Sequence, residues 1–373
     1  MKKTSIITLA ITILVSMALL VGCSSTVDST SATKSTSVTA ATSAAVDLSA
    51  SSEVYKLDMS IGLPPIATMA KLMQTWIDKV EEQSNGRVEI TFYTGGTLLS
   101  LPEQFRGVQS GVTDITWYAV GTDPGVLPLN EIGNLSFLGW KSAEQASKIY
   151  NDLLSPDTTY TKFRDEFVNL GVIPYGARTM PPAQIFTISK TIRVPADTKG
   201  MKLYAGGSMS EIISNIGGSP LEVNPDDWYT SLERGLIEGG CFHYATINAL
   251  GISELLKYDT TFGDTGCYLE PNVYLFNAAT WNSLPADIQN IFLDLEPWLY
   301  EQTRLADISD TEIALQVAKD QDHTFIELTQ DEINQWEEVA KPTQEKYLTE
   351  KEAAGATSIR EAYQQLQKMI SEN

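Results

Sequence analysis

The sequence has few of the side chains on which most catalytic and metal sites depend. Its 373 residues include only two histidines, His243 and His323, and neither lies in an HExxH or related spacing. The nucleophile motif GxSxG and the phosphate-binding motif GxxxxGKS/T are absent, and the stretch YAGGSMS does not match GxGxxG. We therefore expect neither an enzyme nor a cofactor or metal site.

Positive charge is also scarce, because 26 lysine and arginine residues face 47 aspartate and glutamate residues and the formal net charge is −21. Phosphate backbones repel a strongly acidic protein, which argues against binding to nucleic acid. The acidic residues are spread along the chain instead of forming one block, a pattern typical of a solubilising surface.

Cysteine is the third scarce residue, and only Cys23, Cys241 and Cys267 are present. Outside the cytosol the last two could oxidise to a disulfide if their Cα atoms approach within about 7 Å. The sequence leaves open a disulfide and a pair of buried free thiols.

The longest apolar run, residues 6–21, follows Lys2 and Lys3, as in a secretory signal. It is shorter than the ~20 residues of a membrane-spanning helix, which disfavours an uncleaved membrane anchor. The motif LVGC at residues 20–23 resembles a bacterial lipobox. We therefore expect residues 1–22 to be a signal peptide, cleaved before a lipidated Cys23 that anchors the protein to the cell membrane.

Serine, threonine and alanine make up 22 of the 29 residues from 24 to 52. Such a segment cannot bury enough apolar surface to offset the entropy of ordering the chain. We expect residues 23–52 to be the lipidated cysteine and a disordered tether. From residue 53 onward aromatic residues are spread as in a globular protein, over enough chain for two lobes.

The first part of the globular region alternates between two hydrophobic periods. The stretches VYKLDMSIGLPP, RVEITFYTGG and VTDITWYAV predict strands, whereas TMAKLMQTWIDKVEEQSNG carries an apolar helical stripe and LPEQFRGVQSG predicts a helix that ends at Gly111. The alternation predicts a parallel sheet with helices on both faces.

After Pro174 the same pattern begins again and predicts a second α/β lobe. The residues LPAD at 284–287 then begin a very long helical pattern, which could span both lobes. No tandem repeat of fixed period is present.

The mature chain, from about Tyr55 to Met369, resembles the substrate-binding proteins of TRAP transporters, the type that binds dicarboxylates and sialic acid. The resemblance is carried, in the family's order, by EEQSNGRVEITFYTGGTL, LPEQFRGVQSGVTDIT, GNLSFLGW, VPADTKGMKLYAGG, NPDDWYTSLERGLIEGG and WNSLPADIQNIF.

The resemblance implies an α/β, two-lobed periplasmic-binding-protein-like fold with a long hinge-spanning helix. Lobe I would comprise residues 53–175 plus 263–303, and lobe II residues 176–262 plus 304–373. Such a protein is an extracytoplasmic monomer that closes on a small-molecule ligand and delivers it to TRAP membrane permease subunits driven by an ion gradient. The alternative is a ligand-sensing lipoprotein that docks to a signalling receptor.

Three positions depart from the polar pattern of the family. Family members usually carry, where this chain has Tyr204, an arginine whose planar fork grips a substrate carboxylate. Phe242 stands at a position that is usually asparagine, and Ala119 at a position that is acidic in some members.

One basic anchor remains, because Arg178 in YGARTM matches the family's G-x-R position. The resemblance places Arg178 in the ligand site, and a salt bridge at the surface of a lobe is the alternative. Trp117 and Tyr118 are consecutive residues of the strand predicted from Asp114 onward. Neighbouring side chains of a strand point to opposite faces, so one of the two should face the cleft while the other packs inside.

Three further positions are candidate ligand contacts. Glu270 and Asn272, in LEPNVY, lie where the family's second crossing strand supplies contacts, although packing or surface exposure is an alternative for both. His243, between two aromatic residues, is either a packed side chain or a ligand contact. We expect His323, in the turn DQDHTFIEL, to be exposed.

These residues predict the chemical class of the ligand. Losing a bidentate guanidinium at Tyr204 makes a small dicarboxylate a poor ligand, because an unpaired buried carboxylate is costly. Tyr204, Phe242 and one of Trp117 or Tyr118 would line the cleft with aromatic faces. We expect a neutral or singly acidic solute with aromatic or apolar surface, with Arg178 holding a single acidic group; a carboxylate of the usual family kind bound by Arg178 is the alternative.

Overall fold

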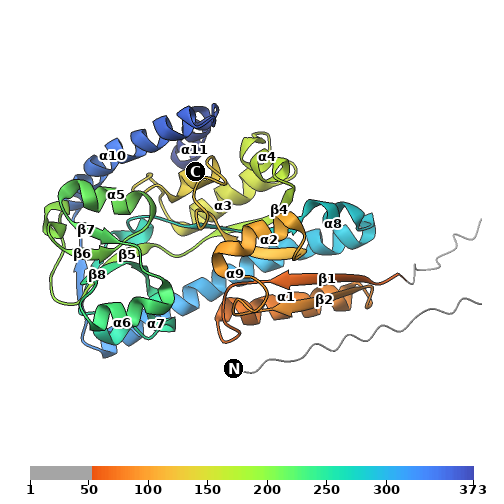
Figure 1. Ribbon diagram of the computed structural model, residues 1–373, viewed down its shortest axis with the longest axis horizontal. Coiled ribbons are helices and arrows are strands. Elements are labelled where there is room, and N and C mark those ends of the chain that lie inside the picture. Colours follow the sequence, from red (N-terminus) through yellow and green to blue (C-terminus); the bar gives the residue numbers. More distant parts are fainter. Residues whose placement is uncertain (1–52) are drawn as a thin grey trace, which may run out of the picture. The chain divides into compact units, whose positions relative to one another are not determined.

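The computed structural model describes residues 53–373, which form two mixed β-sheets flanked by helices (Figure 1). The predicted signal peptide, the lipidated Cys23 and the tether of residues 23–52 lie outside the described residues. Within the described part of the chain, no helix is long and apolar enough to cross a membrane.

The first sheet has five strands and follows the predicted order of elements. In spatial order the strands are β2 (Val88–Tyr93), β1 (Tyr55–Ser60), β3 (Ile115–Ala119), β10 (Pro271–Asn277) and β4 (Val172–Thr179). Between β1 and β2 the chain forms α1 (Thr68–Gln83), which buries the predicted apolar stripe, including Trp76, against the sheet.

The helix predicted to end at Gly111 is confirmed. A short 3-10 helix, η1 (Leu101–Glu103), leads into α2 (Gln104–Ser110). Gly111 then closes α2 with φ of 77°, a left-handed conformation that a glycine adopts at little cost.

The second sheet has six strands. In spatial order they are β11 (Thr324–Glu327), β9 (Tyr258–Thr261), β5 (Ala183–Thr187), β8 (Gly239–His243), β6 (Lys202–Tyr204) and β7 (Ser219–Leu221). One face of this sheet packs against α5 (Gly207–Ile216) and α10 (Gln330–Ala353), and the other against α6 (Trp228–Glu233) and α7 (Tyr244–Ala249).

The prediction of a parallel sheet is wrong for the strands next to the crossings between the sheets. β10 is antiparallel to β3 and β4, and β5 is antiparallel to β8 and β9. The chain crosses between the sheets from β4 to β5 and from β9 to β10. The strand after each crossing begins beside the last residues of its neighbours and therefore runs antiparallel to them. The two remaining pairs of the first sheet, β1 with β2 and with β3, are parallel as predicted.

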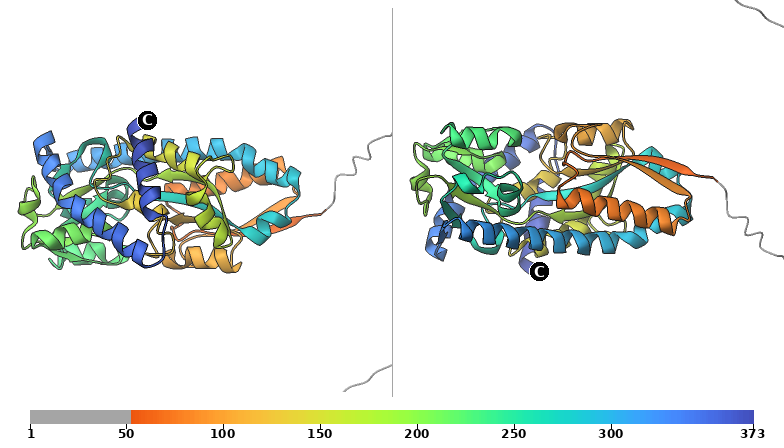
Figure 2. Two further views of the ribbon diagram at one scale, coloured as in Figure 1. Left: turned by 90° about the horizontal axis from the view of Figure 1, so that it is seen from above. Right: turned by 90° about the horizontal axis from the view of Figure 1, so that it is seen from below.

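The long helix predicted after Pro285 is confirmed as α9 (Ala286–Asp320). It packs on α1 and β4 beside the first sheet and on α7 beside the second, so it spans both sheets. In Figure 2, α9 runs past α1 and on to the helices of the second sheet in both views.

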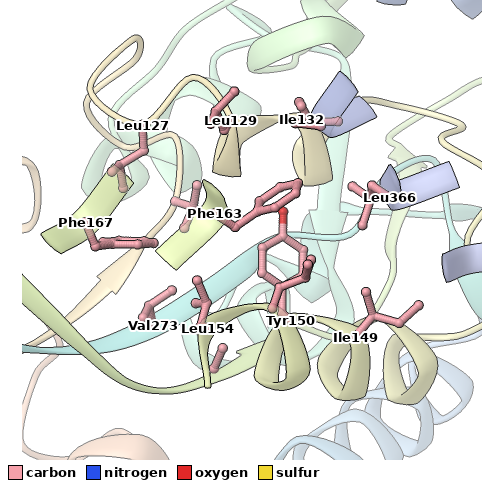
Figure 3. Close-up of a cluster of buried hydrophobic side chains, with 14 of the residues drawn as sticks. Leu127, Leu129, Ile132, Ile149, Tyr150, Leu154, Phe163, Phe167, Val273 and Leu366 are labelled. Carbon is pink, nitrogen blue, oxygen red and sulfur yellow. The ribbon is translucent and has the colours of Figure 1, made fainter. Parts of the chain in front are cut away.

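The C-terminal helix α11 (Ile359–Glu372) packs differently from the predicted division into lobes. We assigned residues 304–373 to lobe II, whereas Leu366 of α11 shares one buried cluster with Ile149 and Tyr150 of α3 (Ala143–Leu154), beside the first sheet. Figure 3 shows these three side chains pointing into the same core. The lobe boundaries otherwise stay a prediction.

The remaining elements are connections and covering helices. They are η2 (Asn130–Asn134), α4 (Lys162–Asn169), η3 (Pro195–Thr198), η4 (Pro225–Asp227), η5 (Ser253–Leu255), η6 (Gly263–Thr265) and α8 (Ala278–Ser283).

Cys241 and Cys267 are both buried and free, which decides between the two alternatives that the sequence left open. The Cys267 thiol donates a hydrogen bond to the carbonyl oxygen of Ala183 at 3.2 Å. The pKa of the Cys241 thiol is raised, first by a hydrogen bond with Cys267 and second by burial.

The prediction that His323 is exposed is wrong, since its residue is only 7% exposed. Its Nδ1 lies 2.9 Å from Oδ1 of Asp259, and its Nε2 lies 2.9 Å from the carbonyl oxygen of Ser253. The Tyr244 hydroxyl donates to the other carboxylate oxygen of Asp259 at 3.3 Å. The turn after α9 therefore carries His323 back against β9, where a long-range partner makes its burial possible.

Candidate functional site

The ends of several strands meet where the chain crosses between the two sheets. β3 and β4 of the first sheet end here, β10 begins here, and β6 and β8 of the second sheet end here. A bridge between Ala183 and Tyr268 ties the two crossing segments together. Ligands of α/β sheets bind at the carboxyl ends of parallel strands, so this edge is the candidate site.

Three of the predicted site positions form one row on the first sheet. Asn272 of β10 pairs with Arg178 of β4 on one side and with Ala119 of β3 on the other. Directly paired residues of antiparallel strands point to the same face, so the three side chains share a face. Trp117 and Tyr274 form the next row of that face.

Arg178 is the cation of the site. It is 5% exposed, and its Nη1 donates to Oδ2 of Asp307, which projects from α9. Burial raises the pKa of the Asp307 carboxyl to about 6, although Arg178 acts in the opposite direction. Nε of Arg178 is buried and has no hydrogen-bond partner among the described residues, so the guanidinium retains a donor for a ligand.

Glu270 lies in the second crossing, immediately before β10. Burial raises the pKa of its carboxyl to about 7, and the charge of Arg178 lowers it again in part. Glu270 Oε2 is 3.9 Å from Nε2 of His243, at the end of β8. The crossing thus places an acid with a near-neutral pKa between the two sheets.

His243 is buried, and its Nδ1 lies 2.6 Å from the carbonyl oxygen of Pro181. Because a carbonyl only accepts, Nδ1 carries the proton. Burial lowers the pKa of His243 to about 4, so the ring is neutral near pH 7 and Nε2 is an acceptor. His243 therefore packs at the site edge without adding a charge.

The alternation of Trp117 and Tyr118 divides their roles. Trp117 shares the face of Arg178, is 4% exposed, and its Nε1 has no partner among the described residues. Tyr118 points to the opposite face, where its ring packs on Phe105, 5.2 Å away, and its hydroxyl accepts from the amide of Asp123. Both rings belong to buried clusters, but of the two only Trp117 lies on the face that carries Arg178 and Asn272.

Asn272 is fully buried in the same row. Its Nδ2 donates to the carbonyl oxygen of Glu270 at 3.1 Å, which fixes the orientation of the amide because a carbonyl cannot donate. Its Oδ1 is a buried acceptor that has no hydrogen-bond partner among the described residues.

Tyr204 and Phe242 stack on each other at the ends of β6 and β8, with ring centroids 5.3 Å apart and planes 8° apart. Trp228 packs on Tyr204 at 4.5 Å. Phe242 is only 1% exposed and lies within the core, whereas Tyr204 is partly exposed. Burial, and then the charge of Glu270, raise the pKa of the Tyr204 phenol, so Tyr204 lies within electrostatic reach of the crossing.

A glycine makes the stack of Tyr204 on Phe242 possible. Gly240 pairs with Tyr204 in the sheet, and a Cβ at this position would lie 2.7 Å from Tyr204 Cβ and 2.8 Å from Phe242 Cζ. Only glycine leaves room there for both rings.

Asp307, Tyr268 and Tyr274 also lie at or beside the candidate site and were not predicted from the sequence. Asp307 lies among other acids of α9 and is distinguished only by its ion pair with Arg178. Tyr268 packs edge-on against His243 at 5.9 Å, and the Tyr274 hydroxyl reaches Met69 at 3.4 Å. The strand pattern around Val273 could have indicated that Tyr274 shares the face of Asn272.

Within the described residues no group of three or more histidine, cysteine or acidic side chains could hold a metal ion. The arrangement offers instead a buried cation, an indole donor, an amide acceptor and aromatic surface. Such a set can bind a small organic solute, and it contains no activated nucleophile.

The family model of bacterial extracellular solute-binding protein, family 7, matches residues 59–351. A curated solute-binding protein of Chromohalobacter salexigens is 22% identical over 223 residues, which cover 59% of this chain and 64% of that protein. The match thus spans less than two thirds of the length of this relative.

Two solved structures share the fold. One is a TRAP solute-binding protein from a marine metagenome, specific for aromatic acid ligands and in complex with metahydroxyphenylacetate; the TM-score is 0.76 at 22% identity, covering 85% of this chain and 99% of that one. The other, from Rhodoferax ferrireducens, was solved with copurified benzoate; the TM-score is 0.73 at 20% identity, covering 86% and 98%.

Proposed function

The chain belongs to the bacterial extracellular solute-binding proteins of family 7, and from this premise we propose that it captures a small organic acid between its two lobes and delivers it to a TRAP membrane permease. The family is one of binding proteins and not of enzymes, in agreement with the scarcity of catalytic groups in the sequence. The observation that carries the proposal is the buried Arg178, which retains a free donor at the edge where the strand ends of both sheets meet.

We propose that the acid carries a single negative charge. Arg178 already faces the carboxylate of Asp307, and Glu270 lies close enough to influence it. A second carboxylate on the ligand would meet no further cation in this group of residues, and burial of an unpaired carboxylate is costly. The acid would replace or join Asp307 on the guanidinium, with Trp117 Nε1 as a second donor.

The body of the solute would be aromatic or apolar. Trp117 and Tyr204 would supply the aromatic contacts, and Phe242 stacks on the Tyr204 ring. The aromatic acids bound by the two structural neighbours support this class. The departure at Tyr204, where the family usually has arginine, supports it as well.

Closure would couple binding to transport. A ligand that touches Arg178 on the first sheet and Tyr204 or His243 on the second makes its full set of contacts only when the two lobes approach each other. The helix α9 contacts elements beside both sheets and would bend or shift as they move.

The test is a calorimetric titration of phenylacetate and 3-hydroxybenzoate beside succinate, malate and sialic acid, with small-angle scattering of the free and loaded protein. We expect micromolar or tighter binding of the aromatic monoacids, weak binding of the diacids, and a smaller radius of gyration in the loaded state. The monoacid should be recovered unchanged. Tight binding of succinate, or turnover of the solute, would contradict the proposal.

We also propose that Cys23 carries a lipid and anchors the protein outside the cytoplasm, where it acts as a monomer. Cys23→Ala should move the protein from the membrane fraction to the soluble fraction without changing its affinity for the acid. Retention of the variant in the membrane would contradict the lipid anchor.

A further inference from the structure

Three buried polar atoms of the candidate site lack partners on the same face of the first sheet. Trp117 Nε1, Arg178 Nε and Asn272 Oδ1 are each unpaired among the described residues, and their residues are 4%, 5% and 0% exposed. Buried polar groups in folded proteins nearly always have a partner. Three such atoms in two adjacent rows of one face therefore indicate a group that the protein is built to receive.

The three atoms are not chemically equivalent. Trp117 and Arg178 can only donate, so both suit a carboxylate. The Asn272 Nδ2 group donates to the Glu270 carbonyl oxygen, so the unpaired atom of this amide is Oδ1, which can only accept. A bare carboxylate would satisfy the two donors and leave Oδ1 facing another acceptor.

We propose that the solute carries a hydrogen-bond donor, a hydroxyl or an ammonium group, on a carbon atom one or two bonds from the carboxylate carbon, and that Asn272 Oδ1 accepts from it. Asn272 and Arg178 are directly paired, so their Cβ atoms are about 5 Å apart and the two ligand groups must be close neighbours. The inference rests on the proposed function and adds a determinant of specificity to it.

The charges around Asn272 are compatible with such a donor. Glu270 and Asp307 are both acids, and they border the same group of side chains. A donor beside the carboxylate places its partial or full positive charge toward these acids. An acid without a donor brings only negative charge.

The experiment is a calorimetric titration with matched acids that differ only in the donor. Phenylacetate, mandelate and phenylglycine carry hydrogen, hydroxyl or ammonium next to the carboxylate; 3-phenylpropanoate and 3-hydroxy-3-phenylpropanoate form the pair one bond farther away. We expect at least one donor-bearing acid to bind about tenfold or more tightly than its unsubstituted partner. Mandelate and phenylglycine together distinguish a hydroxyl from an ammonium group.

A variant identifies the acceptor. Asn272→Leu keeps the approximate volume and removes Oδ1, so we expect the preference to fall below about threefold while the unsubstituted acid still binds. Asn334→Leu, an exposed position on α10, is the control and should keep the full preference. The wild-type comparison decides the inference even if Asn272→Leu does not fold.

Equal binding of donor-bearing and unsubstituted acids by the wild type, within threefold in both series, would overturn the inference and leave the proposed function standing. An unchanged preference in Asn272→Leu would overturn the role of Asn272. If none of the acids binds, the proposed function itself fails.

Discussion

Two buried pairs of a basic and an acidic residue differ in how completely their polar atoms are satisfied by hydrogen bonds. In the pair of His323 with Asp259, both side chains are fully buried, both ring nitrogens have partners, and Tyr244 donates to the second carboxylate oxygen. In the pair of Arg178 with Asp307, the guanidinium keeps an unpaired Nε and the Asp307 side chain is 19% exposed.

The locations of the two pairs explain this difference. His323 and Asp259 join the end of α9 to β9, away from the crossings, and a complete network there serves stability. Arg178 lies where the strand ends meet, and the incomplete network there leaves its Nε–H group available to a ligand. A buried charge with unused hydrogen-bonding capacity is therefore better evidence of function than burial alone.

The largest expected effect is on stability, from the complete pair. His323→Ala leaves the buried Asp259 carboxyl without its contact to the His323 ring and should lower the free energy of unfolding by about 3 kcal/mol, measured by urea denaturation. The surface variant Gln316→Ala, nearby on α9, should change it by less than about 0.5 kcal/mol. A loss below about 1 kcal/mol in His323→Ala would show that the network is not structural.

The next effect is on binding, from the incomplete pair. Arg178→Gln removes a charge-assisted hydrogen bond worth about 1.5–3 kcal/mol, so the affinity for phenylacetate should fall roughly 10- to 150-fold in a calorimetric titration. Its stability should fall less than that of His323→Ala, because Asp307 reaches solvent and can take up a proton.

The control for this variant is Arg304→Gln. Arg304 is also paired with an acid of α9, Glu301, but is far more exposed than Arg178. Its replacement should leave the affinity unchanged. If Arg178→Gln binds phenylacetate as tightly as Arg304→Gln does, Arg178 is not the anchor.

A smaller effect concerns pH. Because the pKa of Glu270 is raised to about 7, Glu270 is neutral below this pH and repels a bound carboxylate above it. The affinity for phenylacetate should therefore fall roughly three- to tenfold between pH 6 and pH 8. Glu270→Gln should flatten this dependence, and an equally steep decline in the variant would assign the effect to another group.

The raised pKa of Glu270 also makes the stability of the protein depend on pH. The folded state binds the Glu270 proton more tightly than the unfolded chain, so this contribution to the free energy of unfolding is present below about pH 4.5 and is lost as the pH rises through 7. Urea denaturation of the wild type and Glu270→Gln at pH 5 and pH 8 should show a smaller decline in the variant.

The smallest effect concerns the aromatic surface. Tyr204→Leu removes the aromatic face that we propose to contact the solute; an aromatic pair is worth about 0.5–1.5 kcal/mol, so the preference for phenylacetate over butyrate should fall a few-fold. Tyr118→Phe, on the opposite face of the first sheet, should leave the preference unchanged. Equal preferences in all three proteins would remove Tyr204 from the site.

Local patterns were sufficient to predict much of the fold. The apolar stripe around Trp76 predicted α1, Gly111 predicted the end of α2, and the residues from Pro285 onward predicted the long α9. The antiparallel direction of β5 and β10 was not predictable in this way, because a buried strand has the same apolar pattern in either direction.

The candidate site was predictable only in part, because its members are joined by contacts distant in sequence. Alternation showed that one of Trp117 and Tyr118 faces the site, but the choice depended on the pairing of β3 with β10. Asp307 is separated from Arg178 by 129 positions, and nothing near it distinguishes it from other helix acids. Long-range partners of this kind also explain why His323 is buried.

The most direct test of the account is a crystal structure of the protein with phenylacetate or mandelate bound. We predict the carboxylate of the ligand within hydrogen-bond distance of Arg178 Nε and Trp117 Nε1, with its ring toward Tyr204. Arg178 bound to Asp307 alone, with the acid at a place remote from the strand ends of the first sheet, would contradict the central claim.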